Sequence, residues 1–198
     1  DSPRHVPRFR VISERELEML PEPQWQIAGM LPVAGLGVLF GAPGSFKSFV
    51  AIDLANATAS GKTWHKVGVR QGRVVYTMAE GSHGAKLRQR AWKRSRGIFG
   101  LLDVDFVTEP VNLLDSTAVS AFIADVLASG PPPVLVILDT WHACMVGAGE
   151  NDAKDTGIAI DSCRLISRET GAAVIALHHP GKANEQERGS SSLRGAAD

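Results

Sequence analysis

A glycine-rich turn between two apolar segments constrains the fold of this chain more than any other feature. Residues 41–48 read G-A-P-G-S-F-K-S, directly after the apolar run 37–40 and directly before the apolar stretch 49–57. This order predicts a strand, a tight turn and the start of a helix. Backbone N–H groups in such a turn and the positive end of the following helix favour a bound phosphate. The segment therefore predicts an α/β domain with a phosphate-binding loop.

The residues of this loop indicate how a nucleoside triphosphate would be held. Lys47, expected to lie outside the core, would reach the β- and γ-phosphates, and the hydroxyl of Ser48 would bind Mg²⁺. The motif G-x-x-x-x-G-K-[ST] has glycine where this chain has Phe46, so the Phe46 side chain must point away from the nucleotide. A helix N-terminus with a chance lysine is the alternative. The predicted nucleotide-binding residues are Gly41, Ala42, Pro43, Gly44, Ser45, Phe46, Lys47, Ser48 and Phe49.

Length and composition indicate a single globular domain. A chain of 198 residues is long enough for one α/β domain and too short for two ordinary ones. The formal net charge is zero, so a contact with nucleic acid would need a local basic patch. The chain has 2 cysteines, no apolar run of membrane-spanning length and no signal-peptide core, so we expect a soluble, cytoplasmic protein.

Strand and helix patterns alternate from residue 37 onward. Short apolar segments predict strands at 37–40, 73–78, 104–107, 134–139 and 173–178. Helices are predicted at 47–60, 85–96, 117–129 and 156–170. This alternation favours a mostly parallel sheet with helices on both faces. Residues 1–36, which are rich in proline and contain a short predicted helix at 13–20, form a predicted N-terminal arm or lid, and residues 37–198 form the predicted core.

Two short patterns sharpen these helix predictions. Ser13 and Glu16 have the spacing of a capping box at the start of the first helix. Asp115 or Ser116 is the expected cap of the helix 117–129. The residues expected on the apolar face of that helix are Val119, Phe122, Ile123, Val126 and Leu127.

Two predicted strands end in an acid, at the sheet edge where parallel sheets bind ligands. Asp139 is the last residue of the strand predicted within the run V-L-V-I-L-D-T, residues 134–140. It is placed to hold Mg²⁺ through its water shell. Glu80 ends the run V-V-Y-T-M-A-E and would lie beside Asp139 if the two strands are neighbours. It could then orient or deprotonate the water that attacks the γ-phosphate. The alternative for Asp139 is a residue in a turn that merely ends the strand. The alternative for Glu80 is a residue that caps a helix or forms a surface ion pair.

Two histidines, His178 and His179, come at the end of the last predicted strand. An imidazole could donate a hydrogen bond to a γ-phosphate and lose it after hydrolysis, which is a sensor role. Pro180 favours an extended conformation of His179, so the two rings should point to opposite sides and only one should face the nucleotide. A structural histidine is the alternative, and adjacent histidines lack the ligand spacing of a zinc site.

Two basic segments are candidate contacts with nucleic acid. The polar residues 181–192 predict a surface loop, and Lys182, Arg188 and Arg194 would be its contacts with DNA phosphates. An inert loop is the alternative. The segment 83–96, which contains the predicted helix 85–96, is also basic, and this favours a solvated helix face over a nucleic-acid or subunit contact. Its basic residues are Lys86, Arg88, Arg90, Lys93, Arg94 and Arg96.

The order of these motifs resembles that of RecA-like ATPases, in particular phage and plasmid replicative helicases of the AAA-25/RepA type, and more distantly DnaB-type helicases. The likeness runs from Trp25 onward in the segments V-V-Y-T-M-A-E-G-S-H-G, I-L-D-T, L-H-H-P-G-K and R-G-S-S-S-L-R-G-A-A-D. It implies Lys47 and Ser48 for phosphate and Mg²⁺. It also implies Glu80 as the catalytic glutamate, Asp139 as the metal acid, and His179 as the sensor where DnaB-type members have glutamine. The family core would continue past Asp198 into strands that carry an arginine finger.

The function that the resemblance implies is an ATP-driven DNA motor, a helicase or translocase that self-associates into a ring, expected to be a hexamer, on single-stranded or branched DNA. A RecA-like recombination or repair ATPase that acts on DNA junctions is an alternative on the same fold. A small-molecule P-loop kinase fits less well, because no arginine-rich lid follows the third helix and Glu80 suits water activation. A nucleotide-binding protein with little turnover is the remaining alternative, which Phe46 supports.

Overall fold

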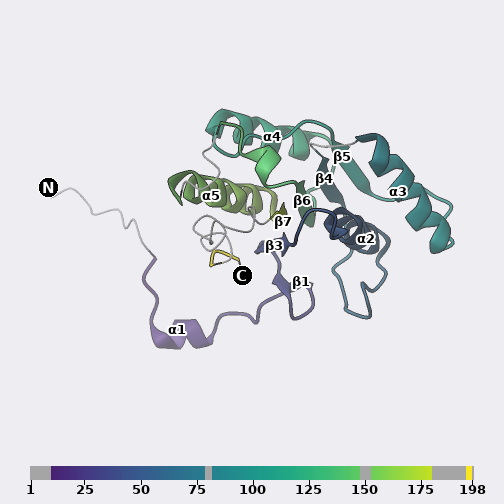
Figure 1. Cartoon of the computed structure of the whole chain (residues 1–198). Helices are drawn as coiled ribbons and strands as arrows, with labels where there is room; N and C mark the ends of the chain where they lie inside the picture. The colour runs from purple at the N-terminus through teal and green to yellow at the C-terminus, as the bar shows by residue number, and fades with distance from the viewer. Residues whose placement is uncertain (1–9, 79–81, 148–152, 180–194, 198) are drawn as a thin grey trace, which may run out of the picture.

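A five-stranded parallel sheet lies at the centre of the part of the chain that the structure, a computed structural model, describes (Figure 1). The described residues are 10–78, 82–147, 153–179 and 195–197. The strands are β3 (Leu36–Phe40), β4 (Val74–Met78), β5 (Val104–Val107), β6 (Leu135–Asp139) and β7 (Ala173–His178). They are arranged in the order β3-β7-β6-β4-β5, and every neighbouring pair is parallel. Strand β7 therefore separates β3, which leads into the glycine-rich loop, from β6, which ends in Asp139.

Helices cover both faces of the sheet (Figure 1). On one face lie α2 (Lys47–Ser60) and α3 (Ser82–Ser95), and on the other lie α4 (Ser116–Ala128) and α5 (Ala153–Thr170). The structure thus confirms the α/β fold with a parallel sheet between two helical layers. Strands β5 and β7 and helix α2 begin and end at the predicted residues, and the other predicted elements agree to within three residues at each end.

The alternation of side chains along the strands divides the apolar core into two layers. The layer beneath α2 and α3 includes Val74, Tyr76, Leu135, Ile137 and Leu177. The layer beneath α4 and α5 includes Val75, Val136, Leu138, Val174 and Ala176. Asp139 follows the alternation of Leu135 and Ile137, so it falls on the α2 face of the sheet. His178 follows the alternation of Val174 and Ala176, which places it on the opposite face.

Helix α4 matches its predicted apolar face except at one residue. The carboxylate of Asp115 accepts a hydrogen bond from the backbone N–H of Thr117 at 2.8 Å, so Asp115 is the N-cap. Val119, Phe122, Ile123 and Val126 are buried, but Leu127 is 39% exposed, and its assignment to the buried face was wrong. The buried seam follows the i, i+3, i+4, i+7 spacing from Val119, and residue 127 lies at the margin of that seam.

Residues 10–36 contain two short strands that no sequence pattern indicates. Strands β1 (Trp25–Ile27) and β2 (Leu31–Pro32) pair in antiparallel fashion, and Ile27 and Leu31 are buried in the α2-side layer. Strands this short carry too few alternating residues for a periodic signal. Helix α1 (Glu14–Glu18) has the predicted capping box and no buried residue. The division of the chain into an arm and a core at residue 36 stays a prediction.

Arg73 joins three parts of the fold at the amino end of β4. Its buried guanidinium donates hydrogen bonds to Asp105 Oδ2 on β5 at 2.7 Å and to Ser129 Oγ after α4 at 2.6 Å. It also donates to the backbone carbonyls of Val126 at 2.9 Å and Pro131 at 2.8 Å. One side chain therefore fixes the end of α4 against the sheet.

Arg73→Met should lower the free energy of unfolding by about 3 kcal/mol, because buried carbonyls and a carboxylate lose their donor. Denaturant titration followed by circular dichroism measures the loss. Asp105→Asn is the matched control, and it should cost less than about 1 kcal/mol, since the Asp105 side chain is 53% exposed. Equal losses in the two variants would contradict the importance of the backbone contacts.

Candidate functional site

The glycine-rich loop joins β3 to α2 at the carboxyl end of the sheet. The N–H of Gly41 donates to the carbonyl of His178 at 3.3 Å, which ties the loop to the end of β7, and the N–H of Ser45 donates to the carbonyl of Ala42 at 3.1 Å. A Cβ at Gly41 would lie 2.7 Å from Ser45 Oγ, and Gly44 has a φ of +77°. Gly44 therefore requires glycine for its left-handed backbone, whereas a side chain at residue 41 would force the Ser45 hydroxyl to rotate away.

Phe46 occupies a position with a left-handed backbone. It is the N-cap of α2 with a φ of 63°, a conformation that glycine adopts freely and that costs other residues about 1 kcal/mol or more. This backbone explains why the motif has glycine here. The ring is 69% exposed and packs edge-on against Phe49, with 5.7 Å between the ring centroids. The ring therefore lies at the surface of the protein.

A pair of substitutions measures the strain at residue 46. Phe46→Gly and Phe46→Ala both remove the ring, but only glycine is free of the left-handed penalty. We expect the glycine variant to be more stable to unfolding than the alanine variant by about 1 kcal/mol. Thermal unfolding of the two proteins under identical conditions checks this. Equal stabilities would mean that the backbone at residue 46 is unstrained.

Lys47 is held inside the loop. Its Nζ donates to the backbone carbonyls of Gly41 at 2.6 Å and Ala42 at 2.8 Å. The residue is only 6% exposed, so the expectation that it lies outside the buried part of the protein was wrong. Burial lowers the pKa of Lys47, and the charge of Asp139 acts in the opposite direction. The ammonium group therefore lies within the electrostatic reach of the acid that ends β6.

Ser48 and Asp139 meet at the hydroxyl of Tyr76. Tyr76, on β4, donates a buried hydrogen bond of 2.6 Å to Asp139 Oδ2, and the Ser48 side chain lies close enough to affect the pKa of the phenol. Burial and the neighbouring Asp139 raise the pKa of Tyr76 far above its ordinary value, against opposing effects of Arg88 and Ser48. The phenol is therefore protonated and acts as a donor. No sequence motif marks Tyr76, and its one signal is its place inside the strand that leads to Glu80.

Helix α3 places the positive charge of Arg88 near the hydroxyl of Tyr76. The guanidinium of Arg88 lies 5.5 Å from the centroid of the Phe49 ring, and its charge acts on the hydroxyl of Tyr76. The Nε of Arg88 is buried, and no described residue accepts a hydrogen bond from it. The preferred interpretation of this helix as a solvated basic face is wrong for Arg88, which is half-buried, whereas Lys86 and Arg90 are exposed. Periodicity could not show this, because the contacts of Arg88 lie on α2 and β4.

His178 and His179 lie at the carboxyl end of β7, beside the start of the glycine-rich loop. His178 pairs in register with Phe40 of β3, and the centroids of their two rings are 5.6 Å apart. Both histidines are half-buried. Because His178 has the alternation of the α5 face, the residue after it is the one expected to turn toward the loop helix. The choice of His179 as phosphate sensor stays a prediction.

Several predicted site residues lie outside the described part of the chain. These are Glu80, Lys182, Arg188 and Arg194. The strand that precedes Glu80 is a neighbour of β6, with Met78 paired to Asp139, as the proposed meeting of Glu80 and Asp139 requires.

The described residues offer oxygen ligands for Mg²⁺ but no cluster of metal-binding side chains. Within the described ranges, no group of three or more His, Cys, Asp or Glu side chains could hold a metal ion. Mg²⁺ in nucleotide sites binds through one or two carboxylates, substrate phosphates and water. The hydroxyl of Ser48 and the carboxylate of Asp139, both near the Tyr76 hydroxyl, are therefore suitable partners for a nucleotide-bound Mg²⁺.

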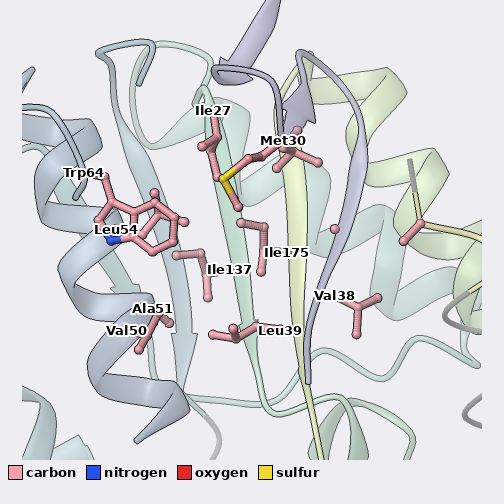
Figure 2. A pocket seen from close by; sticks show the side chains of 13 residues that line it. Ile27, Met30, Val38, Leu39, Val50, Ala51, Leu54, Trp64, Ile137 and Ile175 are labelled. Atoms are coloured by element: carbon pink, nitrogen blue, oxygen red, sulfur yellow. The ribbon is translucent and has the colours of Figure 1, made fainter. Parts of the chain in front are cut away.

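An apolar pocket of about 240 Å³ lies on the α2 face of the sheet (Figure 2). Figure 2 shows Leu54 and Trp64 facing Ile137 and Ile175 across it. Among the described residues, its lining contains no charged side chain and none of Lys47, Ser48 and Asp139. Because phosphate needs charged or N–H donors, the glycine-rich loop is the better candidate for the nucleotide site.

The parallel sheet, the glycine-rich loop after β3 and the acid that ends β6 define a P-loop nucleotide-binding domain. A family model for an AAA domain, AAA-25, matches residues 2–185. The chain therefore belongs to the AAA-25 family of RecA-like P-loop ATPases. A comparison with curated proteins finds no match. Within the described residues, no helix is both long and apolar enough to cross a membrane.

Proposed function

We propose that this protein is an ATP-dependent DNA motor, a helicase or translocase that hydrolyses ATP with Mg²⁺ and works as a ring. The observation that carries the ATPase part is the meeting of Lys47, Ser48 and Asp139 at one end of the sheet. The resemblance to replicative helicases of the AAA-25/RepA type and the basic residues after β7 support the DNA part.

The residues of the site divide into those that bind phosphate and those that act on water. Lys47 would exchange its two carbonyl partners for phosphate oxygens, while the loop N–H groups and the N-terminus of α2 bind the remaining charge. Ser48, and Asp139 through water, would hold Mg²⁺, whose chemical contribution when bound would be to neutralise phosphate charge. Glu80 would orient or deprotonate the attacking water, and His179 would sense the γ-phosphate.

ATP hydrolysis measured with and without single-stranded DNA tests this function. We expect DNA to stimulate the rate. Unwinding of a fork would then favour a helicase, and movement of a four-way junction would favour a recombination ATPase. Sedimentation in the presence of nucleotide tests the ring. Binding of ATP without turnover in either condition would leave a P-loop nucleotide-binding protein in place of a motor.

The segment 181–192 begins three residues after the end of β7 in the sequence, and its basic residues are our proposed link between DNA and the nucleotide site. Lys182→Ala combined with Arg188→Ala should weaken binding of single-stranded DNA and flatten its salt dependence, because phosphate contacts release counterions. Basal hydrolysis should persist, and stimulation by DNA should be lost. Fluorescence anisotropy over a salt series measures the binding.

The exposed pair Lys86 and Arg90 on α3 provides the matched control. Replacing both with alanine removes the same charge elsewhere and should leave the salt dependence nearly unchanged. If this control variant lost DNA affinity and the first variant kept it, the contact would lie on α3.

A further inference from the structure

We propose that Tyr76 is a positioning residue for Mg²⁺, because its hydroxyl fixes the carboxylate of Asp139 from within the core. This inference rests on the metal part of the proposed function. It adds a residue from β4, which belongs to neither the glycine-rich loop nor the strand that ends in Asp139.

The Tyr76 ring is immobilised by its surroundings. The residue is 1% exposed and lies in the α2-side core layer with Val74, Leu135 and Ile137. Its ring packs against Phe106 of β5, with 5.9 Å between the centroids. A tyrosine has two side-chain torsions, and close packing leaves the hydroxyl one position at the edge of the core.

The hydrogen bond to Asp139 selects one carboxylate oxygen. Tyr76 donates to Oδ2, so Oδ1 remains available to accept from water or to face a cation. Because Asp139 is buried, few other donors compete for Oδ2. Without the hydroxyl, the carboxylate would lose the contact that sets its rotation about the Cβ–Cγ bond.

The Ser48 side chain lies near the same hydroxyl, close enough to affect the pKa of Tyr76. Of the two side chains expected to hold Mg²⁺, Asp139 is the one that Tyr76 holds by a hydrogen bond. Hydrogen-bond partners behind metal ligands orient those ligands, and their loss weakens metal binding by about 10-fold to 100-fold. A contact that served stability alone would leave the Mg²⁺ affinity of the folded protein unchanged.

Tyr76→Phe tests the inference, because it removes the hydroxyl and keeps the ring. Mg²⁺ is titrated into the full chain with a fluorescent ADP analogue, and the Mg²⁺ concentration for half-maximal binding is measured. We expect this concentration to rise about 10-fold or more, while binding of the analogue in EDTA stays as in the wild type. Thr77→Val is the control: it removes a neighbouring buried hydroxyl whose bond goes to the carbonyl of Ile137, and it should leave the Mg²⁺ dependence unchanged.

A double-mutant cycle with Asp139→Asn separates the routes by which Tyr76 could act. If Tyr76 works through Asp139, Tyr76→Phe should add little once Asp139 is changed. Should Tyr76→Phe fold poorly, 4-fluorophenylalanine at residue 76 removes the O–H donor and keeps nearly the original volume. An unchanged Mg²⁺ requirement in a folded variant overturns the inference, whereas a wild type whose nucleotide binding ignores Mg²⁺ overturns the metal site itself.

Discussion

Lys47→Ala should abolish ATP hydrolysis and strongly weaken nucleotide binding. The ammonium group is already inside the loop, 2.6 Å and 2.8 Å from the carbonyls of Gly41 and Ala42, where no other described side chain donates to them. Its removal takes away the positive charge closest to the expected phosphates. Phosphate release and binding of a fluorescent nucleotide measure the two effects.

The stability of Lys47→Ala should change by no more than about 1 kcal/mol, because two effects oppose each other. The variant loses two hydrogen bonds to backbone carbonyls, but it no longer buries a charge whose desolvation lowers the pKa of Lys47. Lys62→Ala, at an exposed lysine just after α2, is the matched control and should keep full activity. Hydrolysis at the wild-type rate in a folded Lys47→Ala protein would end the assignment of the phosphate-binding loop.

Glu80→Gln should lower turnover by about two to four powers of ten while nucleotide still binds, which is the usual contribution of a positioned general base. The amide keeps the size of the side chain and loses the ability to accept a proton. Single-turnover hydrolysis and nucleotide affinity need to be measured on the same preparation.

The exposed Glu109 between β5 and α4 is a suitable control, because Glu109→Gln makes the same chemical change outside the site. It should have no effect on turnover. A parallel fall of binding and turnover in Glu80→Gln would make Glu80 a structural residue.

The sequence predicts the layers of this fold well because its signals are local. The strand β7 and the helix α2 are continuous apolar or amphipathic segments with clear ends, and Asp115 caps α4 through its own neighbour, Thr117. The motif also indicates which loop residues approach a phosphate. The left-handed backbone at residue 46 accounts for the glycine that the motif has where this chain has Phe46.

The contacts that complete the candidate site are less visible in the sequence because they join distant residues. Tyr76 and Asp139 are 63 residues apart, and they meet because β4 and β6 pair in one register. Arg88 stacks on Phe49 across two helices, which a count of charges along α3 cannot show. The short strands β1 and β2 were not predicted for a different reason. Strands of two or three residues are too short to show an alternation of apolar and polar residues.

The adjacency of β3 and β7 has a mechanical consequence. Five residue pairs in register, from Leu36 with Val174 to Phe40 with His178, join the strand that enters the nucleotide loop to the strand that leaves toward residue 180. The Gly41 N–H continues this ladder to the carbonyl of His178. A pull on the chain beyond His179, along the strand axis, would thus load these hydrogen bonds together in shear. The start of the glycine-rich loop and the end of β7 would therefore move together.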